Sequence, residues 1–290
     1  MTASAAAGPS ALVLLAATLL RIPARRVRAL ACGDDGALRA WLANESATRL
    51  AEARRDARLA AARLEALGAR LVALGAGDYP AGLRDLRDPP PFLIVRGVLS
   101  RADSCAGTAI IGTREPDEEA EAFARALAHA GVAAPIVSGL ARGVDAAAHR
   151  GALAAGVPTC AYVGHGIGAT YPPEHRDLED AIVAAGGAVL SEVLPDEMVT
   201  RWSLVRRDRL QAAHAAAVVL IASERDGGAM HALATARELG RPRFALEPLR
   251  AADGTPAARY AGNAHAIADG ATPIPLASDV ARAIIANERV

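Results

Sequence analysis

From residue 108 onward, short apolar runs alternate with longer stretches of helical composition, and this alternation constrains the fold more than any other feature. The runs are largely free of polar residues, as in strands that a parallel sheet buries on both faces. Each intervening stretch is about 11 residues long, enough for one crossover helix. We therefore predict an α/β fold with a doubly wound, mostly parallel sheet. The predicted strands are 108–111, 135–137, 157–163, 187–190, 217–221 and 243–246. The predicted helices are 116–130, 145–155, 174–185, 203–213 and 229–239.

The beginning of the chain has a different composition. Alanine, leucine and arginine dominate residues 11–68, which favours helices, with a break at the glycine-rich segment 32–36. Strands are predicted at 70–74 and 92–95, separated by a linker rich in turns and prolines. We predict three parts: a small all-α N-terminal domain at 1–69, an α/β domain at 70–275, and a C-terminal helix and tail at 276–290.

Positive side-chain charge comes from arginine alone, because the sequence contains no lysine. The 32 basic and 32 acidic residues cancel at pH 7, which excludes a protein that attracts nucleic acid through bulk charge. Any nucleic-acid site must be a local patch, and arginine suits one because its guanidinium group binds phosphate through paired hydrogen bonds. A genomic bias towards arginine and alanine is the better explanation for most of these arginines.

Cysteine usage and hydropathy indicate a protein of the cytoplasm. Three scattered cysteines are too few for a disulfide framework or a paired-cysteine metal site. The apolar run 11–20 is too short to span a bilayer, lacks the positive n-region of a signal peptide, and is followed directly by arginines. We therefore expect a cytoplasmic location and no membrane partner.

Glycines, small hydroxyl residues and arginines recur where the predicted parallel strands end. Ligands of open parallel sheets bind beyond the carboxyl ends of the strands, so these segments form the candidate site. Glycine lets backbone N–H groups approach an anion, while arginines and helix N-termini supply positive charge. The pattern predicts a phosphate-binding rim, although turn geometry alone explains the glycines of any single loop. The strand-end segments are 112–114, 138–143, 164–168, 191–192 and 224–228.

Two motifs point to other chemistry. The segment 164–169 has the spacing of a dinucleotide-binding fingerprint, but prolines at 172 and 173 prevent a helix from starting there, so we reject a dinucleotide cofactor. Asp145 and His149 lie four residues apart on one predicted helix, a spacing that suits an acid–base pair or two metal ligands. Without a third ligand, a structural role is the better interpretation. We predict no metal, no cofactor and no catalytic residue.

The strongest local concentration of charge lies near residue 205. Arginines neutralise phosphates and an aromatic ring stacks on bases, so a cluster of this kind suits a single-stranded nucleic acid. A solvated helix face explains the same residues equally well. The cluster consists of Arg201, Trp202, Arg206, Arg207, Asp208 and Arg209.

The segment Val137–His149, with the sequence V-S-G-L-A-R-G-V-D-A-A-A-H, resembles the DNA-processing protein A family (DprA, also called Smf). Other matches to the family occur in the expected order between residues 75 and 274, so the resemblance is specific. They begin at Tyr79 (Y-P), Asp88 (D-P-P), Arg96 (R-G), Gly112 (G-T-R), Gly151 (G-A-L), Tyr162 (the strand, glycine loop and Y-P step), Leu190 (L-S-E), Arg207 (R-D-R), Gly227 (G-G), Gly240 (G-R), Gly262 (G-N) and Gly270 (G-A).

The resemblance implies an extended Rossmann-like domain preceded by a small helical domain. It also implies a non-enzymatic mediator of DNA recombination that binds single-stranded DNA, forms homodimers, and loads a RecA-type recombinase during natural transformation. The chain ends before the winged-helix domain that many family members carry, so none is expected. Together with the strand-end pattern, the resemblance gives the predicted DNA- and phosphate-binding residues: Gly112, Thr113, Arg114, Ser138, Gly139, Arg142, Gly164, His165, Gly166, Arg206, Arg207, Arg209, Gly227 and Gly228.

The chain departs from the family pattern at positions that bear on this site. Asp208 replaces the asparagine between the two arginines and adds a negative charge. Ala229 and Ala232 stand where the family has serine and threonine, so two hydroxyl contacts to phosphate are lost. His165 occupies a loop position that is usually small. We therefore expect a divergent DNA site.

Two alternative functions belong to other classes. Lysine-decarboxylase-like (LOG) phosphoribohydrolases have a related architecture, which would make the chain a nucleotide-hydrolysing enzyme. However, residues 226–233 lack the Gly-Thr pair and the catalytic glutamate of those enzymes. The other alternative is a nucleotide sensor whose loops hold a small phosphorylated ligand. Release of free base, or preference for free nucleotides over oligonucleotides, distinguishes these alternatives from a DNA-binding protein.

Overall fold

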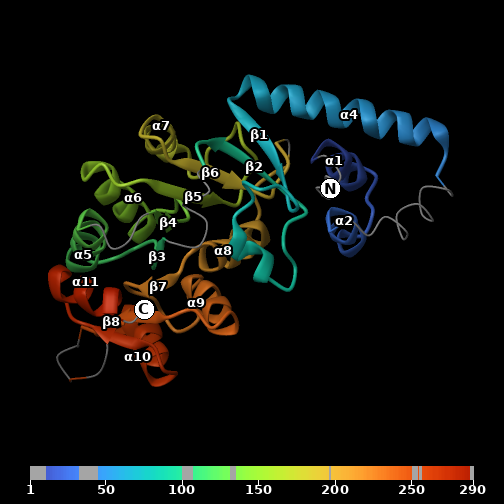
Figure 1. Cartoon of the computed structure of the whole chain (residues 1–290). Coiled ribbons are helices and arrows are strands. Elements are labelled where there is room, and N and C mark those ends of the chain that lie inside the picture. Colours follow the sequence, from blue (N-terminus) through green and yellow to red (C-terminus); the bar gives the residue numbers. More distant parts are fainter. Residues whose placement is uncertain are drawn as a thin grey trace, which may run out of the picture.

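The computed structural model describes residues 11–32, 45–99, 107–130, 135–195, 197–249, 254 and 257–287. Within them, nine strands form one sheet in the order β1-β2-β6-β5-β4-β3-β7-β8-β9 (Figure 1). Only the β1–β2 and β2–β6 pairs are antiparallel, which confirms the prediction of a mostly parallel sheet. The strands are β1 Ala69–Ala73, β2 Phe92–Gly97, β3 Thr108–Ile111, β4 Ile136–Ser138, β5 Thr159–Val163, β6 Ala188–Ser191, β7 Ala217–Leu220, β8 Arg243–Leu246 and β9 Thr272–Ile274.

Helices cover both faces of the sheet, as its apolar strands require. Alternate residues of β7 show this arrangement: Ala217 and Val219 belong to a core cluster that includes α5 and α6, whereas Val218 and Leu220 belong to one that includes α8 and α9. The helices of this region are α5 Glu118–His129, α6 Val144–Ala154, α7 Arg176–Ala184, α8 Arg201–His214, α9 Ala229–Glu238, α10 Ala261–Ala268 and α11 Ser278–Asn287.

The start of α8 differs from the sequence prediction in a way that matters for the site. The helix begins at Arg201 instead of residue 203, because Thr200 and Ser203 form a reciprocal capping box. The two additional residues place Arg201 in the first helical turn, so its position relative to the rest of α8 is fixed by helix geometry.

The chain changes direction along the sheet between β3 and β7. Strands β3, β4, β5 and β6 follow one another towards one edge, and β7 then returns to pair with the other side of β3. A reversal of this kind opens a crevice at the carboxyl ends of the two strands, because their connections leave in opposite directions.

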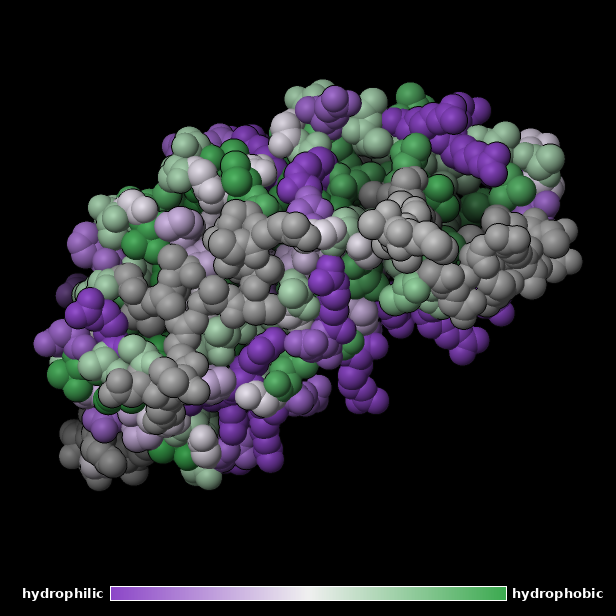
Figure 2. Space-filling view, viewed as in Figure 1, coloured by the Kyte–Doolittle hydropathy of each residue, from purple (hydrophilic) through white to green (hydrophobic). Residues whose placement is uncertain are grey.

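Three described helices precede the sheet: α1 Ala11–Leu19, α2 Ala24–Ala31 and α4 Ala47–Ala66. Helices α1 and α4 pack against β1, and hydrophilic side chains are numerous along α4 (Figure 2). The predicted break at 32–36 lies, apart from Cys32, outside the described residues, and the domain bounds at 69 and 275 stay predictions. No described helix combines the length and the apolar character needed to cross a bilayer.

Asn263 in α10 connects the ends of β7 and β8. Its Nδ2 donates hydrogen bonds to the carbonyl groups of Ile221 (2.9 Å) and Leu246 (3.0 Å), and its Oδ1 accepts one from the Ser223 N–H (3.0 Å). The side chain is fully buried. A Cβ at the neighbouring Gly262 would lie 2.6 Å from the Glu224 carbonyl oxygen, so this close approach requires glycine. Asn263 therefore positions the segment that follows β7.

Replacing this buried amide should destabilise the fold. We expect Asn263→Leu to lower the free energy of unfolding by about 2–4 kcal/mol, because buried backbone groups lose their hydrogen-bond partners. Urea denaturation monitored by circular dichroism measures the change. Glu238→Ala, on the exposed face of α9, is the control and should shift stability by less than about 0.5 kcal/mol. An Asn263→Leu effect as small as this control would contradict the proposed role.

Candidate functional site

A cleft of about 690 Å³ lies at the switch between β3 and β7. Segments after these two strands form part of its wall, together with residues from the starts of α6 and α9 and from α8 between Arg201 and Gln211. Six of the predicted site residues line it: Gly112, Thr113, Arg114, Arg207, Gly227 and Gly228. The other eight lie outside the lining: Ser138, Gly139, Arg142, Gly164, His165, Gly166, Arg206 and Arg209.

Arg207 forms part of the floor of this cleft. Its guanidinium group lies between two carboxylates, with Nη2 at 3.5 Å from Asp145 Oδ2 and Nε at 3.3 Å from Asp208 Oδ1. The side chain is only 5% exposed. It packs directly on the backbone of Gly139, where a Cβ would lie 1.1 Å from Nη1. Glycine at 139 therefore makes room for this guanidinium, which explains its presence without a phosphate contact.

Asp208 is held beside Arg207 in the same floor. Its Oδ1 also accepts a hydrogen bond from Gln211 Nε2 at 3.1 Å. Burial raises the pKa of the Asp208 carboxyl to about 7, and the Asp145 carboxylate adds to this rise, while the Arg207 and Arg114 charges oppose it. The negative charge of the Asp208 carboxyl is therefore partly lost near neutral pH.

The arginine cluster predicted from the sequence divides between two faces of α8. Arg201 and Arg207 line the cleft, whereas Arg206 and Arg209 both bind Glu192, at 3.2 and 2.9 Å. Arg209 also contacts Asp88. Helical geometry causes this division, because residues 206 and 209 are three apart and share a face that excludes 207.

Two arginines at the cleft form no ion pair with another residue in the described parts of the chain. These are Arg114, which follows β3, and Arg201, and both are exposed. The N-terminus of α9 lies beside them, and no side chain caps it. Free guanidinium groups and a helix N-terminus both favour an anion, and they share the cleft with the carboxylates of Glu115, Glu224 and Asp226.

Arg201 and Gln211 were not among the predicted site residues, although both line the cleft. A signal for them exists in the sequence: positions 201, 204, 208 and 211 recur at helical spacing and therefore share one face. Arg142, which was predicted, instead binds Glu174 at the surface.

The predicted phosphate loop after β5 is a packing element in this structure. A Cβ at Gly164 would lie 3.0 Å from Leu204, and one at Gly166 would lie 2.3 Å from the Leu194 carbonyl oxygen. The His165 side chain is buried, with Nε2 at 3.6 Å from Glu179 Oε2. Close approach of neighbouring segments accounts for both glycines.

Ser138, Asp145 and His149 are engaged in the core. The Ser138 hydroxyl donates to the Ile110 carbonyl, and Asp145 accepts from the Ala141 N–H as well as from Arg207. His149 Nδ1 lies 2.7 Å from the Thr159 hydroxyl oxygen, and burial lowers its pKa to about 3. Within the described ranges, no group of three or more His, Cys, Asp or Glu side chains is arranged to hold a metal ion.

The buried Asp208 carboxyl makes stability depend on pH. Its pKa is raised in the folded state, so between about pH 4 and 7 the folded chain holds a proton that the unfolded chain has lost. The folded chain therefore keeps Asp208 protonated at pH 5, whereas at pH 8 it bears the free-energy cost of an ionised, buried Asp208 carboxylate. Asp208→Asn does not titrate, so its stability relative to the parent should rise by about 2–4 kcal/mol between these pH values. Urea denaturation at both values tests this, and a difference independent of pH would contradict it.

Comparisons with known proteins agree on one family. The family model of DNA recombination-mediator protein A matches residues 70–284. Protein Smf of Synechocystis sp. is 35% identical over 174 residues, which are 58% of this chain and 44% of that protein. DNA processing protein DprA of Streptococcus pneumoniae is 30% identical over 203 residues, 70% of each chain. The aligned part thus spans less than half of the Synechocystis relative.

Solved structures show the same architecture. DNA processing protein A of Streptococcus pneumoniae superposes with a TM-score of 0.67 at 24% identity, covering 92% of this chain and 91% of that chain. A structure of DNA processing protein A from Helicobacter pylori concerns the single-stranded DNA binding mode of that protein. It superposes with a TM-score of 0.64 at 26% identity, covering 75% of this chain and 96% of that chain. The first likeness establishes the extended Rossmann-like fold, and the family match runs from β1 into α11. The chain belongs to the DNA recombination-mediator protein A family.

Proposed function

We propose that this protein binds single-stranded DNA at the cleft between β3 and β7 and acts there as a recombination mediator. The observation that carries the proposal is the cleft itself, where Arg114 and Arg201 form no ion pair with any described residue and lie beside the N-terminus of α9. Phosphate groups of a DNA strand fit this environment, since arginine and helix N-termini both bind phosphate.

The dimensions of the cleft favour a single strand over a duplex. Its volume of about 690 Å³ is that of a site for one small ligand, and a nucleotide of a flexible strand can enter it. A base in a duplex cannot enter unless it first leaves the stack, which costs a few kcal/mol. The structure of the Helicobacter pylori relative concerns single-stranded DNA binding, which also supports a single strand as the ligand.

The family relationship extends the proposal to partners. We propose a homodimer that acts in the cytoplasm during natural transformation and delivers the bound strand to a RecA-type recombinase, without catalysis. A nucleotide-hydrolysing enzyme is the weaker candidate, because residues 226–233 lack the Gly-Thr pair and the catalytic glutamate expected of such an enzyme on this scaffold.

Removing the two free arginines should weaken DNA binding. We expect Arg114→Ala with Arg201→Ala to raise the Kd for a single-stranded 20-mer by about 10- to 100-fold, because each removes a charge-assisted phosphate contact. The slope of log K against log salt should become shallower by about 1.4, because about 0.7 is contributed by each phosphate contact to a single strand. Fluorescence anisotropy across a salt series measures both quantities.

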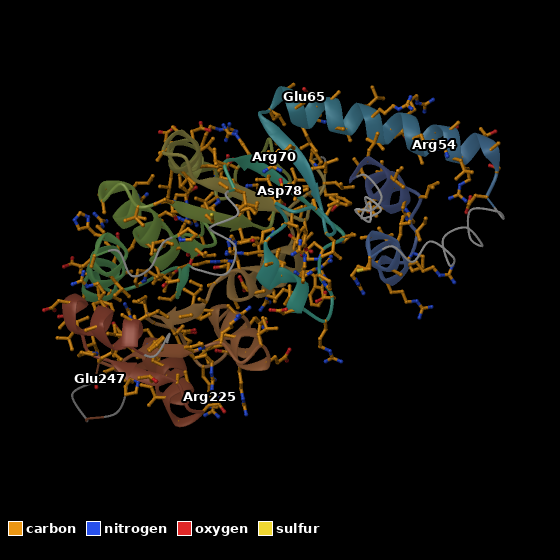
Figure 3. All side chains as sticks on the ribbon, viewed as in Figure 1. Arg54, Glu65, Arg70, Asp78, Arg225 and Glu247 are labelled. Carbon is orange, nitrogen blue, oxygen red and sulfur yellow. The ribbon has the colours of Figure 1, made fainter. Side chains whose placement is uncertain are left out.

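The matched control is Arg54→Ala with Arg58→Ala. Both residues are exposed on α4, and Figure 3 shows Arg54 on that helix, well separated from the loop that carries Arg225 after β7. This control should bind like the parent protein. If it loses as much affinity as the cleft variant, or if the cleft variant binds like the parent, then the cleft is not the DNA site. Arg207 is unsuitable for this test, because its replacement would also leave buried carboxylates unpaired.

A further inference from the structure

The floor of the cleft presents two hydrogen-bond acceptors side by side. Asp208 and Gln211 both line the cleft from α8, and both are less than a tenth exposed. The Gln211 amide donates through Nε2 to Asp208 Oδ1, which fixes the direction of its other atom, Oε1. That Oε1 atom is buried and has no hydrogen-bond partner within the described residues.

The carboxylate of Asp208 provides the second acceptor. Its Oδ1 accepts a hydrogen bond from Gln211 Nε2 and lies 3.3 Å from Arg207 Nε, whereas Oδ2 forms no hydrogen bond within the described residues. Buried polar atoms are nearly always paired in folded proteins, and of these two acceptors Gln211 Oε1 is the one that is buried without a partner. A ligand that brings two adjacent N–H donors would satisfy both atoms.

Among the DNA bases, guanine alone carries two adjacent donors on one edge, its ring N1–H and its N2 amino group. Adenine and cytosine each offer one amino group beside a ring nitrogen that is itself an acceptor. Thymine offers one ring N–H between two carbonyl groups. An acceptor pair therefore attracts guanine and faces acceptor atoms on each of the other three bases.

Neighbouring charges allow an anionic strand to approach this floor. Arg207 contacts Asp208 directly, Arg114 acts on it electrostatically, and Asp145 from α6 is already paired with Arg207. The ionised carboxylate is thus largely compensated, so a phosphate group at the rim meets the free charges of Arg114 and Arg201.

We propose that Asp208 and Gln211 make the cleft selective for guanine, so that the protein binds single-stranded DNA preferentially at guanine nucleotides. This inference rests on the proposed function, because it requires a DNA base to enter the cleft. It depends on an aspartate at position 208, because asparagine there would present one acceptor and one donor where aspartate presents two acceptors.

The experiment compares 9-mers of sequence d(TTTTXTTTT) by fluorescence anisotropy at pH 8, above the Asp208 pKa of about 7. We expect X = guanine to bind about tenfold more tightly than X = thymine, which is within the range of one bidentate base contact. Hypoxanthine at X retains N1–H and lacks the N2 amino group, so it should lose most of the preference. Adenine and cytosine should resemble thymine.

Protein variants assign the preference to the two acceptors. Asp208→Asn should reduce the guanine preference, taken as the ratio of the two Kd values measured on that same variant, to less than about twofold, and Gln211→Met should reduce the ratio in part. Asp56→Asn on α4 makes the same chemical change at an exposed site and should keep the full preference. Circular dichroism of each variant verifies folding, and the hypoxanthine comparison needs no variant.

Two results would overturn the inference and leave the proposed function standing. One is equal binding of the guanine and thymine 9-mers by the parent protein, and the other is a full guanine preference in folded Asp208→Asn. Failure of the parent protein to bind any of the 9-mers would instead overturn the proposed function, and the inference with it.

Discussion

The buried contact of Arg207 with Asp145 and Asp208 is the interaction on which the candidate site depends. It joins α6 to α8 across the backbone of Gly139, so it connects elements that are distant in the sequence. Removing one partner from a buried ion pair is strongly destabilising, because the remaining charge stays buried without compensation. Arg207 and the Asp145 carboxylate therefore depend on each other, and together with Asp208 and Gly139 they set the geometry of the floor of the cleft.

The charged side chains of the candidate site are of two kinds, those that are paired with one another and those that are not. Charges in the floor neutralise one another, whereas Arg114 and Arg201 at the rim have no intramolecular partner within the described residues. Two other arginines of the same helix are held by Glu192. The proposed phosphate site of this chain, which has no formal net charge, rests on Arg114 and Arg201.

Much of the fold follows from local patterns, and much of the site does not. The parallel strands were predictable because each is an apolar run, and the crevice followed from the order of strands and helices. The start of α8 was missed, although Thr200 and Ser203 have the spacing of a capping box. The partners of Arg206 and Arg209 were not predictable, because Glu192 comes from beyond the end of a distant strand. The glycines at 139, 164 and 166 were interpreted as phosphate contacts, but in this structure they make room for neighbouring side chains and backbone.

The most direct test of the central claim is to locate the bound DNA strand by photochemical cross-linking. A single-stranded oligonucleotide containing 5-iododeoxyuridine, irradiated with the protein and analysed by mass spectrometry, reports which residues touch the bases. We predict cross-links to Tyr171 and to those residues of the segment 223–232 that line the cleft, such as His231. Cross-links confined to α4, or to the face of α8 where Arg206 and Arg209 bind Glu192, would contradict it.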